Sequence, residues 1–325
     1  MYKRLWTKAA ALVPVLAAAL VLGCRQEAVK ESLIVGFSQI GAESAWRTCN
    51  TRSIQEAAAG AGVQLLFTNA EQKQENQIKA IRSFIAYQVD VIAFVPIVED
   101  GWENVLEEAK NAGIPVLVTD RKIRVRDESL YAGYFGTDSV QEGREAGYFL
   151  LDKFQDRLES GKAIRIAELA GTVGSSPAQG RAEGFREIIA PYSQFEIVYS
   201  ESGDFLRSKG YELMRLLLAK GPSFDVVYSH NDGMTLGALE AMKERGLDPG
   251  REVVIITIDA EQAAIDALKK GEVNCVIECN PQQGPDIIRL AKDLAAGRAV
   301  PRSAHAEEVV FSEGDDLSAL PPRGY

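Results

Sequence analysis

The sequence contains little histidine and cysteine, and this shortage argues against a metal or redox site. Among 325 residues there are two histidines, His230 and His305, and four cysteines, and no two cysteines are spaced with a histidine as zinc ligands usually are. The glycine-rich stretch at 171–176 lacks the Gly-Lys-Ser/Thr ending of a phosphate-binding loop. We therefore expect no metal and no cofactor.

Positive charge and long apolar runs are also scarce. The formal net charge is -10 at pH 7, which argues against nucleic acid as a partner. The apolar run from Ala9 to Leu22 is too short for an ordinary transmembrane helix. It follows the basic pair Lys3-Arg4, and this combination is typical of a signal peptide.

The end of the apolar run predicts lipidation. Gly23 stands directly before Cys24 in V-L-G-C, which resembles a bacterial lipobox, where cleavage leaves a diacylglycerol-bearing cysteine at the new N-terminus. We expect residues 1–23 to be a signal peptide and residues 24–30 to be a linker that is lipid-anchored through Cys24. The mature chain is then expected in the periplasm or at the cell surface. An ordinary signal peptide cut nearby is the alternative.

Three cysteines follow Cys24. Cys275 and Cys279 lie four residues apart in an expected strand, so their Cα atoms should be about 13 Å apart, beyond the reach of a disulfide. A bridge from Cys49 to one of them is possible in an oxidising compartment, but buried free thiols are the main expectation.

Strands and helices alternate along the rest of the chain. Strand candidates begin at Leu33, Gln64, Val91 and Pro115, with helical segments near 45–60, 72–87 and 102–112. The rhythm restarts with strand candidates at Ala163, Phe195, Asp225 and Glu252. Such alternation predicts right-handed βαβ units and therefore an α/β fold of two doubly wound parallel-sheet lobes with a cleft between them.

Distinctive polar and aromatic side chains follow the expected strands, where ligands bind in such sheets. In the first half they are Ser38, Glu43, Trp46, Arg47, Asp120 and Arg121, and in the second half Arg181, Phe205, Asn231 and Asp259. Asp accepts hydrogen bonds, Arg donates them and Asn does both, so together they suit the hydroxyls of a sugar. The two aromatic rings can stack on its C–H patches.

Each of these residues also has a purely structural interpretation. Asp120 and Arg121 could form a surface ion pair, which contributes only about 0–1 kcal/mol. Asn231 and Asp259 could be helix N-caps, and the aromatic residues could belong to the core. Arg181 could lie on a helix surface.

Several stretches resemble the type I periplasmic sugar-binding proteins of ABC importers, in the ribose- and galactose-binding cluster. They are V-G-F-S-Q-I-G-A-E-S-A-W-R, Q-K-Q-E-N-Q-I-K-A-I-R-S-F, T-D-R, G-T-V-G-S-S, S-G-D-F-L-R-S-K-G, S-H-N-D and T-I-D. The likeness runs from about Leu33 to the C-terminus, and it is greatest to galactofuranose-binding members. It implies a three-crossing hinge, a first lobe from residues 31–136 plus 281–298, and a second from 137–280 plus 299–325.

The resemblance also implies a site and a role. The ligand-binding residues would be Glu43, Trp46, Arg47, Asp120, Arg121, Arg181, Asn231 and Asp259, with Ser38 and Phe205 as further candidates. The protein would be a monomer that captures a galactofuranose- or galactose-like monosaccharide and delivers it to the permease and ATPase of an ABC importer. Gly180 and Ala45 depart from the similar members, which have Asp and Gly there, and both lie beside the expected site.

Three other functions compete with this one. A sugar sensor would present the same lobes to a membrane receptor or histidine kinase. A glycosidase would need Glu43 paired with Asp120 or Asp259, but the neighbouring arginines would keep these acids ionised, so we expect no enzyme. A transcriptional repressor of similar fold is disfavoured because an export signal stands where its DNA-binding helices would be.

Overall fold

The computed structural model describes residues 32–325, which form one compact unit. The expected signal peptide and the lipidation of Cys24 lie outside the described residues. Two six-stranded sheets make up the unit, with strand orders β11-β5-β4-β3-β1-β2 and β12-β10-β9-β8-β6-β7. Across residues 32–325, no helix has both the length and the apolar character needed to span a bilayer.

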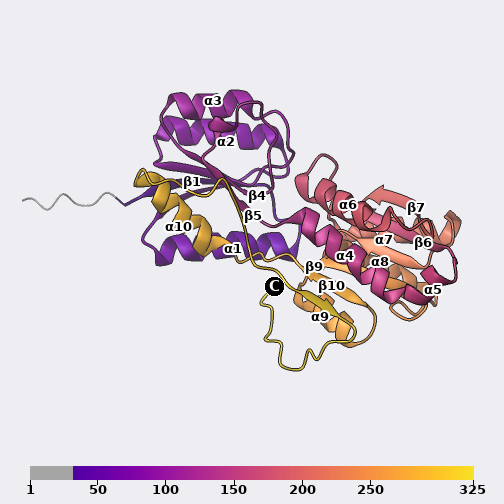
Figure 1. Cartoon of the computed structure of the whole chain (residues 1–325). Coiled ribbons are helices and arrows are strands. Elements are labelled where there is room, and N and C mark those ends of the chain that lie inside the picture. The colour runs from indigo at the N-terminus through magenta and orange to yellow at the C-terminus, as the bar shows by residue number, and fades with distance from the viewer. Residues whose placement is uncertain (1–31) are drawn as a thin grey trace, which may run out of the picture. The chain divides into compact units, whose positions relative to one another are not determined.

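The first sheet is parallel throughout. Its strands are β1 (Ile34–Gln39), β2 (Gln64–Asn69), β3 (Val91–Phe94), β4 (Val116–Asp120), β5 (Gly133–Gly136) and β11 (Ser303–His305). Its helices are α1 (Ala45–Gly60), α2 (Gln74–Tyr87), α3 (Glu103–Asn111), η1 (Glu128–Leu130, a 3-10 turn) and α10 (Gly284–Ala295). Helices α2 and α3 cover one face, and α1 and α10 cover the other (Figure 1).

The second sheet repeats this plan. Its strands are β6 (Ile164–Ala170), β7 (Phe195–Ser202), β8 (Val226–Ser229), β9 (Val254–Asp259), β10 (Cys275–Glu278) and β12 (Val310–Ser312). Its helices are α4 (Ser139–Lys153), α5 (Gln155–Glu159), α6 (Ser176–Ile189), α7 (Arg207–Lys220), α8 (Asp232–Glu244) and α9 (Gln262–Lys269). The edge strand β12 runs antiparallel to β10, while the other pairings are parallel.

Apolar side chains on both faces of each sheet explain this layered arrangement. Val35 and Phe37 of β1 pack toward α1 and α10, whereas Ile92 and Phe94 of β3 pack toward α2 and α3. Strands buried on both faces need helices on both faces. The predicted α/β fold of two doubly wound lobes is thereby confirmed.

The chain passes between the two sheets after β5, after β10 and after β11. One implied lobe boundary is wrong, because residues 299–325 do not all belong to the second lobe. Strand β11 pairs with β5, with Ser303 opposite Tyr134 and His305 opposite Gly136. Backbone hydrogen bonds therefore fix β11 in the first sheet, and the third crossing follows His305.

The remaining cysteines within the described part of the chain are buried free thiols, at Cys49, Cys275 and Cys279. The main expectation for them is therefore confirmed, and the possible bridge from Cys49 is not formed.

Candidate ligand-binding site between the two sheets

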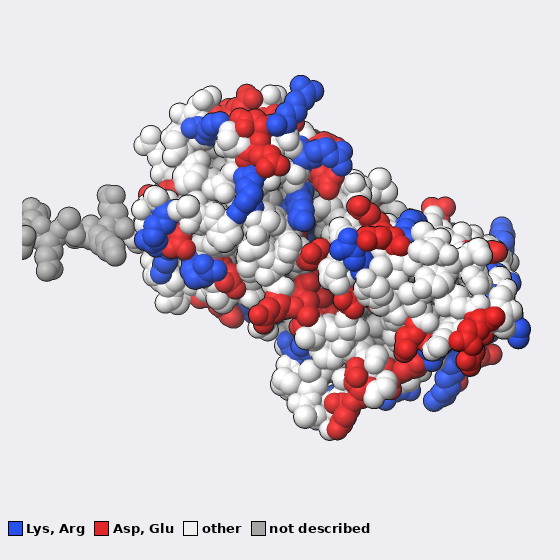
Figure 2. Space-filling view, in the orientation of Figure 1, with Lys and Arg blue, Asp and Glu red and all other residues white. Residues whose placement is uncertain are grey.

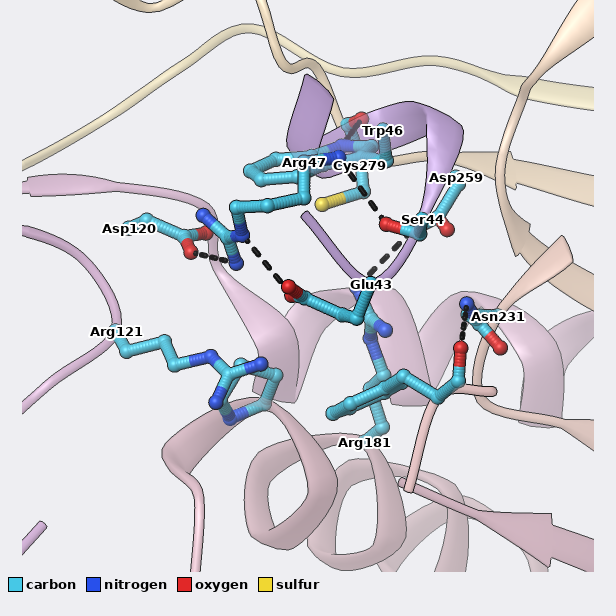
Figure 3. Close-up of a pocket in the computed structure, with 12 residues that line it drawn as sticks. Glu43, Ser44, Trp46, Arg47, Asp120, Arg121, Arg181, Asn231, Asp259 and Cys279 are labelled. Atoms are coloured by element: carbon cyan, nitrogen blue, oxygen red, sulfur yellow. Dashed lines mark hydrogen bonds and ion pairs between the residues drawn. The ribbon is translucent and has the colours of Figure 1, made fainter. Parts of the chain in front are cut away.

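A small cavity of about 30 Å³ lies where the carboxyl ends of strands from both sheets meet (Figure 3). Its lining residues are Glu43, Ser44, Trp46, Arg47, Asp120, Arg121, Pro177, Arg181, Phe205, Asn231, Asp259 and Cys279. The structure thus brings together the eight residues expected to bind ligand, and Phe205 with them. Ser38 is not among the lining residues, because its side chain is buried within β1.

The start of α1 places a buried arginine between two acids. Ser44 caps the helix by accepting a hydrogen bond from the N–H of Arg47. The Arg47 guanidinium then donates to Glu43 Oε1 at 3.1 Å and to Asp120 Oδ2 at 2.7 Å (Figure 3). Burial alone would lower the pKa of Arg47, but the charges of Asp120 and Glu43 outweigh it and raise that pKa.

Asp120 and Arg121 are adjacent at the end of β4, but their side chains point in different directions. Asp120 has a positive φ of 60°, so the two side chains diverge, and Arg121 donates to the carbonyl of Ile97 at 3.1 Å. The two residues are only 5% and 4% exposed. The surface ion-pair interpretation is therefore wrong, because Asp120 pairs with Arg47 in the interior. Burial, together with the charge of Arg47, lowers the pKa of Arg121 to about 10, so Arg121 is still a cation at pH 7.

A close helix contact positions Arg181 on the opposite wall. Gly143 of α4 and Gly184 of α6 let the two backbones approach, since a Cβ on Gly184 would lie 1.9 Å from the carbonyl oxygen of Val140. Arg181 Nε donates to Glu142 Oε2 at 2.6 Å, and Nη1 donates to the carbonyl of His230. Arg181 is thus buried and held rigidly, which rules out the helix-surface interpretation.

Asn231 and Asp259 differ in their structural roles. Asn231 is the N-cap of α8, accepting from the N–H of Met234 at 3.0 Å, and it also donates to the carbonyl of Phe205 at 3.3 Å. Asp259 caps no helix, because the N-cap of α9 is Glu261. Burial raises the pKa of Asp259 well above its usual range despite Arg181, whose nearest nitrogen is 3.8 Å away.

Both aromatic residues pack in the core and also face the cavity. The indole N–H of Trp46 donates to the carbonyl of Cys279 at 2.5 Å, which fixes the ring plane. The Phe205 ring lies 5.5 Å from the Arg121 guanidinium and 5.8 Å from that of Arg181, within cation–π range of both. The core interpretation and the ligand-contact interpretation are therefore compatible for these rings.

Several buried polar atoms of the cavity wall make no hydrogen bond within residues 32–325. They are Glu43 Oε2, Arg47 Nη1 and Arg121 Nε. Buried polar atoms are nearly always hydrogen-bonded, so these atoms are suited to an external partner. They offer one acceptor and two donor positions, which matches the mixed hydrogen bonding of sugar hydroxyls.

Sequence reasoning missed Ser44, Pro177 and Cys279 as lining residues. Each stands close to an element end that was predicted: Ser44 directly before α1, Pro177 in the first turn of α6, and Cys279 directly after β10. Their place at strand and helix ends was the available signal.

Direct hydrogen bonds join the two lobes around the cavity. The N–H of Trp46 donates to Glu261 Oε1 at 3.1 Å, the N–H of Lys122 to Ser176 Oγ at 2.7 Å, and the N–H of Glu99 to the carbonyl of Gly174 at 3.1 Å. Fold and cavity together define a two-lobed protein with a polar cavity at the junction of its lobes.

Comparison with known proteins identifies the family. The profile of the periplasmic binding protein domain matches residues 35–299, and the chain belongs to this family. The galactofuranose-binding protein YtfQ of Escherichia coli is 42% identical over 269 residues, 82% of this chain and 83% of that protein. The resemblance inferred from the sequence is thereby confirmed.

Solved structures agree with this assignment. A Mycobacterium smegmatis protein in complex with β-D-fucofuranose is 44% identical, with a TM-score of 0.86 over 90% of this chain and 95% of that one. The periplasmic binding protein of the arabinose ABC transporter from Shewanella sp. ANA-3, bound to L-arabinofuranose, is 42% identical, with a TM-score of 0.81 over 86% and 92% of the two chains.

Proposed function

We propose that this protein binds one monosaccharide in its five-membered ring form, galactofuranose or a close analogue, and delivers it to an ABC importer. The observation that carries the proposal is the set of buried, unpartnered atoms on Glu43, Arg47 and Arg121 in the cavity wall. The ligands named for the similar proteins, galactofuranose, β-D-fucofuranose and L-arabinofuranose, support the furanose form.

The division of the site between two lobes supports capture by closure. Glu43, Arg47 and Asp120 lie in the first lobe, whereas Arg181 and Asp259 lie in the second. A ligand bonded to both sets favours the closed state by the contacts that only this state provides. The closed lobes would then form the surface that the importer recognises.

The arrangement of the acids disfavours hydrolysis of a glycosidic bond. Glu43 and Asp120 each form an ion pair with the same Arg47 guanidinium, so the two side chains are not free to act as an acid and a base on a glycosidic bond. Recognition without chemistry is the function that this geometry supports best.

We further propose that the protein is exported and acts as a monomer in the periplasm or at the cell surface, anchored to a membrane through a lipid on Cys24. Cells labelled with a radioactive fatty acid should incorporate label into the wild-type chain and not into Cys24→Ala. Equal labelling of both chains would remove the anchor from the proposal.

Calorimetry of the purified protein tests the ligand class. Ring-locked analogues should separate the forms: 1,4-anhydrogalactitol, with a five-membered ring, should bind, and 1,5-anhydrogalactitol, with a six-membered ring, should bind much more weakly. Arg121→Ala should bind the five-membered analogue about 10- to 100-fold more weakly, whereas the exposed control Arg251→Ala should bind it as the wild type does. Failure of every pentose, hexose and analogue to bind would refute the sugar proposal.

Uptake measurements separate import from sensing. Cells lacking the protein should lose accumulation of labelled sugar if it serves an importer. Normal uptake with a lost transcriptional response to the sugar would favour a sensor instead.

A further inference from the structure

Three residues from the three crossing segments converge beside the cavity, which Cys279 also lines. Glu142 lies in the first turn of α4, Cys279 directly follows β10, and Glu308 lies between β11 and β12. One potential ligand atom from each lies within 4.8 Å of the others. Because the three residues are far apart in the sequence, no local sequence motif predicts this cluster.

Glu142 has a buried oxygen without a hydrogen-bond partner, and Glu308 lies beside it. Glu142 is only 2% exposed, and its Oε2 accepts from Arg181 Nε, while Oε1 has no hydrogen-bond partner in the described part of the chain. Glu308 Oε1 accepts from the N–H of Asn280 at 3.1 Å. An unpartnered carboxylate oxygen, buried this deeply beside a second carboxyl group, calls for a cation.

The surroundings favour positive charge. Figure 2 shows acidic side chains gathered around the junction of the two lobes, where the crossing segments of Figure 1 run. Arg181 is the cation already bonded to Glu142, and it occupies only one of the two carboxylate oxygens.

We propose that Glu142, Cys279 and Glu308 form a binding site for a divalent metal ion of the zinc class at the hinge. A thiolate beside carboxylates suits zinc, which accepts both sulfur and oxygen ligands, whereas calcium and magnesium take oxygen. Three protein ligands leave a fourth position for water. Because one ligand comes from each crossing, the ion would hold all three segments in this arrangement.

Titration of the purified, chelator-treated protein with ZnCl₂ and CdCl₂ tests the site. Calorimetry should give one ion per chain, and cadmium should give the ultraviolet charge-transfer band of a metal–thiolate bond. Glu308→Gln should weaken binding by about 100-fold, since even outer-shell changes cost 10–100-fold. Cys279→Ser should abolish the band, while Cys49→Ser and Cys275→Ser keep it.

Matched controls guard against unfolding and surface binding. The exposed neighbour Glu307→Gln should bind zinc as the wild type does, and circular dichroism should show that every variant is folded. Absence of stoichiometric binding to the wild-type protein would overturn the proposal. The proposal would also be overturned if His305→Ala lost zinc binding while Glu308→Gln kept it. That result would place the ion at the His305–Asp138 pair instead.

Discussion

Arg47 and Arg121 line the same cavity, but replacing them should have different effects on stability and on sugar binding. Arg47 neutralises two buried acids, so Arg47→Ala leaves Glu43 and Asp120 without their cation. Removing one partner of a buried ion pair costs about 3–5 kcal/mol of unfolding free energy. Urea unfolding without sugar should show this loss in Arg47→Ala and little change in the exposed control Arg82→Ala. If Arg47→Ala were as stable as the wild type, the ion pairs of Arg47 would not contribute to stability as predicted.

Within residues 32–325 no acid pairs directly with Arg121, and burial together with the charge of Arg47 disfavours its ionised form. Arg121→Ala should therefore leave the unfolding free energy nearly unchanged while weakening sugar binding about 10- to 100-fold, the range expected for charged hydrogen bonds. Calorimetry beside urea unfolding measures both quantities. A stability loss as large as that of Arg47→Ala would mean that Arg121 is chiefly structural.

His230 should make the protein sensitive to mild acid. It is fully buried, its Nδ1 accepts from the N–H of Gly171, and Nε2 lies 3.2 Å from Glu168 Oε1. Burial lowers the pKa of His230 below its usual 6.5, although Glu168 opposes the shift. The unfolded chain therefore binds the proton more readily, so the stability that neutral His230 contributes is complete above about pH 6.5 and falls as pH drops toward the folded pKa. Burial raises the pKa values of Asp259 and Glu308, and these two groups act in the opposite direction.

Urea unfolding at pH 7.5 and 5.5 measures this slope. His230→Asn should flatten it, whereas His305→Gln, at the partly exposed histidine, should keep most of it. Glu168 also has a lowered pKa, but its effect belongs to pH values below its usual 4.5, outside this window. An unchanged slope in His230→Asn would show that another group titrates there.

Residue types were predictable from the sequence, but their partners were not. Strand-end placement selected Asp120 and Arg121, yet the positive φ of Asp120 turned it toward Arg47. Ser38 was chosen by the same rule, but it is the residue before the last of β1, is fully buried and does not line the cavity.

At the scale of elements, the contact of α4 with α6 determines where Arg181 lies. Gly184→Ala would place a Cβ 1.9 Å from the Val140 carbonyl oxygen and push the helices apart. We expect a loss of about 1–3 kcal/mol, as for other overpacked contacts, together with weaker sugar binding because Arg181 moves. Gly60→Ala, where a Cβ meets nothing within 4 Å, is the matched control and should be neutral or slightly stabilising. Thermal unfolding measures the stability loss, and calorimetry measures sugar binding. Normal sugar binding by Gly184→Ala would mean that the helix contact has a purely structural role.

Element prediction succeeded where the apolar pattern was long. The segment expected near 45–60 is α1 (Ala45–Gly60), and the eight expected strands are all present. Strands β11 and β12 were missed because each has only three residues, which are too few to show a hydrophobic period. Their pairing with β5 and β10 comes from tertiary contacts, which explains the misplaced boundary at residues 299–325.

At the scale of the whole molecule, affinity should depend on contacts that never touch the sugar. Ser176 Oγ accepts from the N–H of Lys122 across the lobes, and Ser176 does not line the cavity. Ser176→Ala removes about 0.5–1.5 kcal/mol from the closed state and nothing from the open one, so affinity should fall roughly two- to tenfold through the population of the closed state. Ser83→Ala, on an exposed face of α2, should bind as the wild type does. Because opening releases the ligand, the loss should appear mainly as faster dissociation in stopped-flow measurements, whereas an unchanged dissociation rate would mean that closure does not control release.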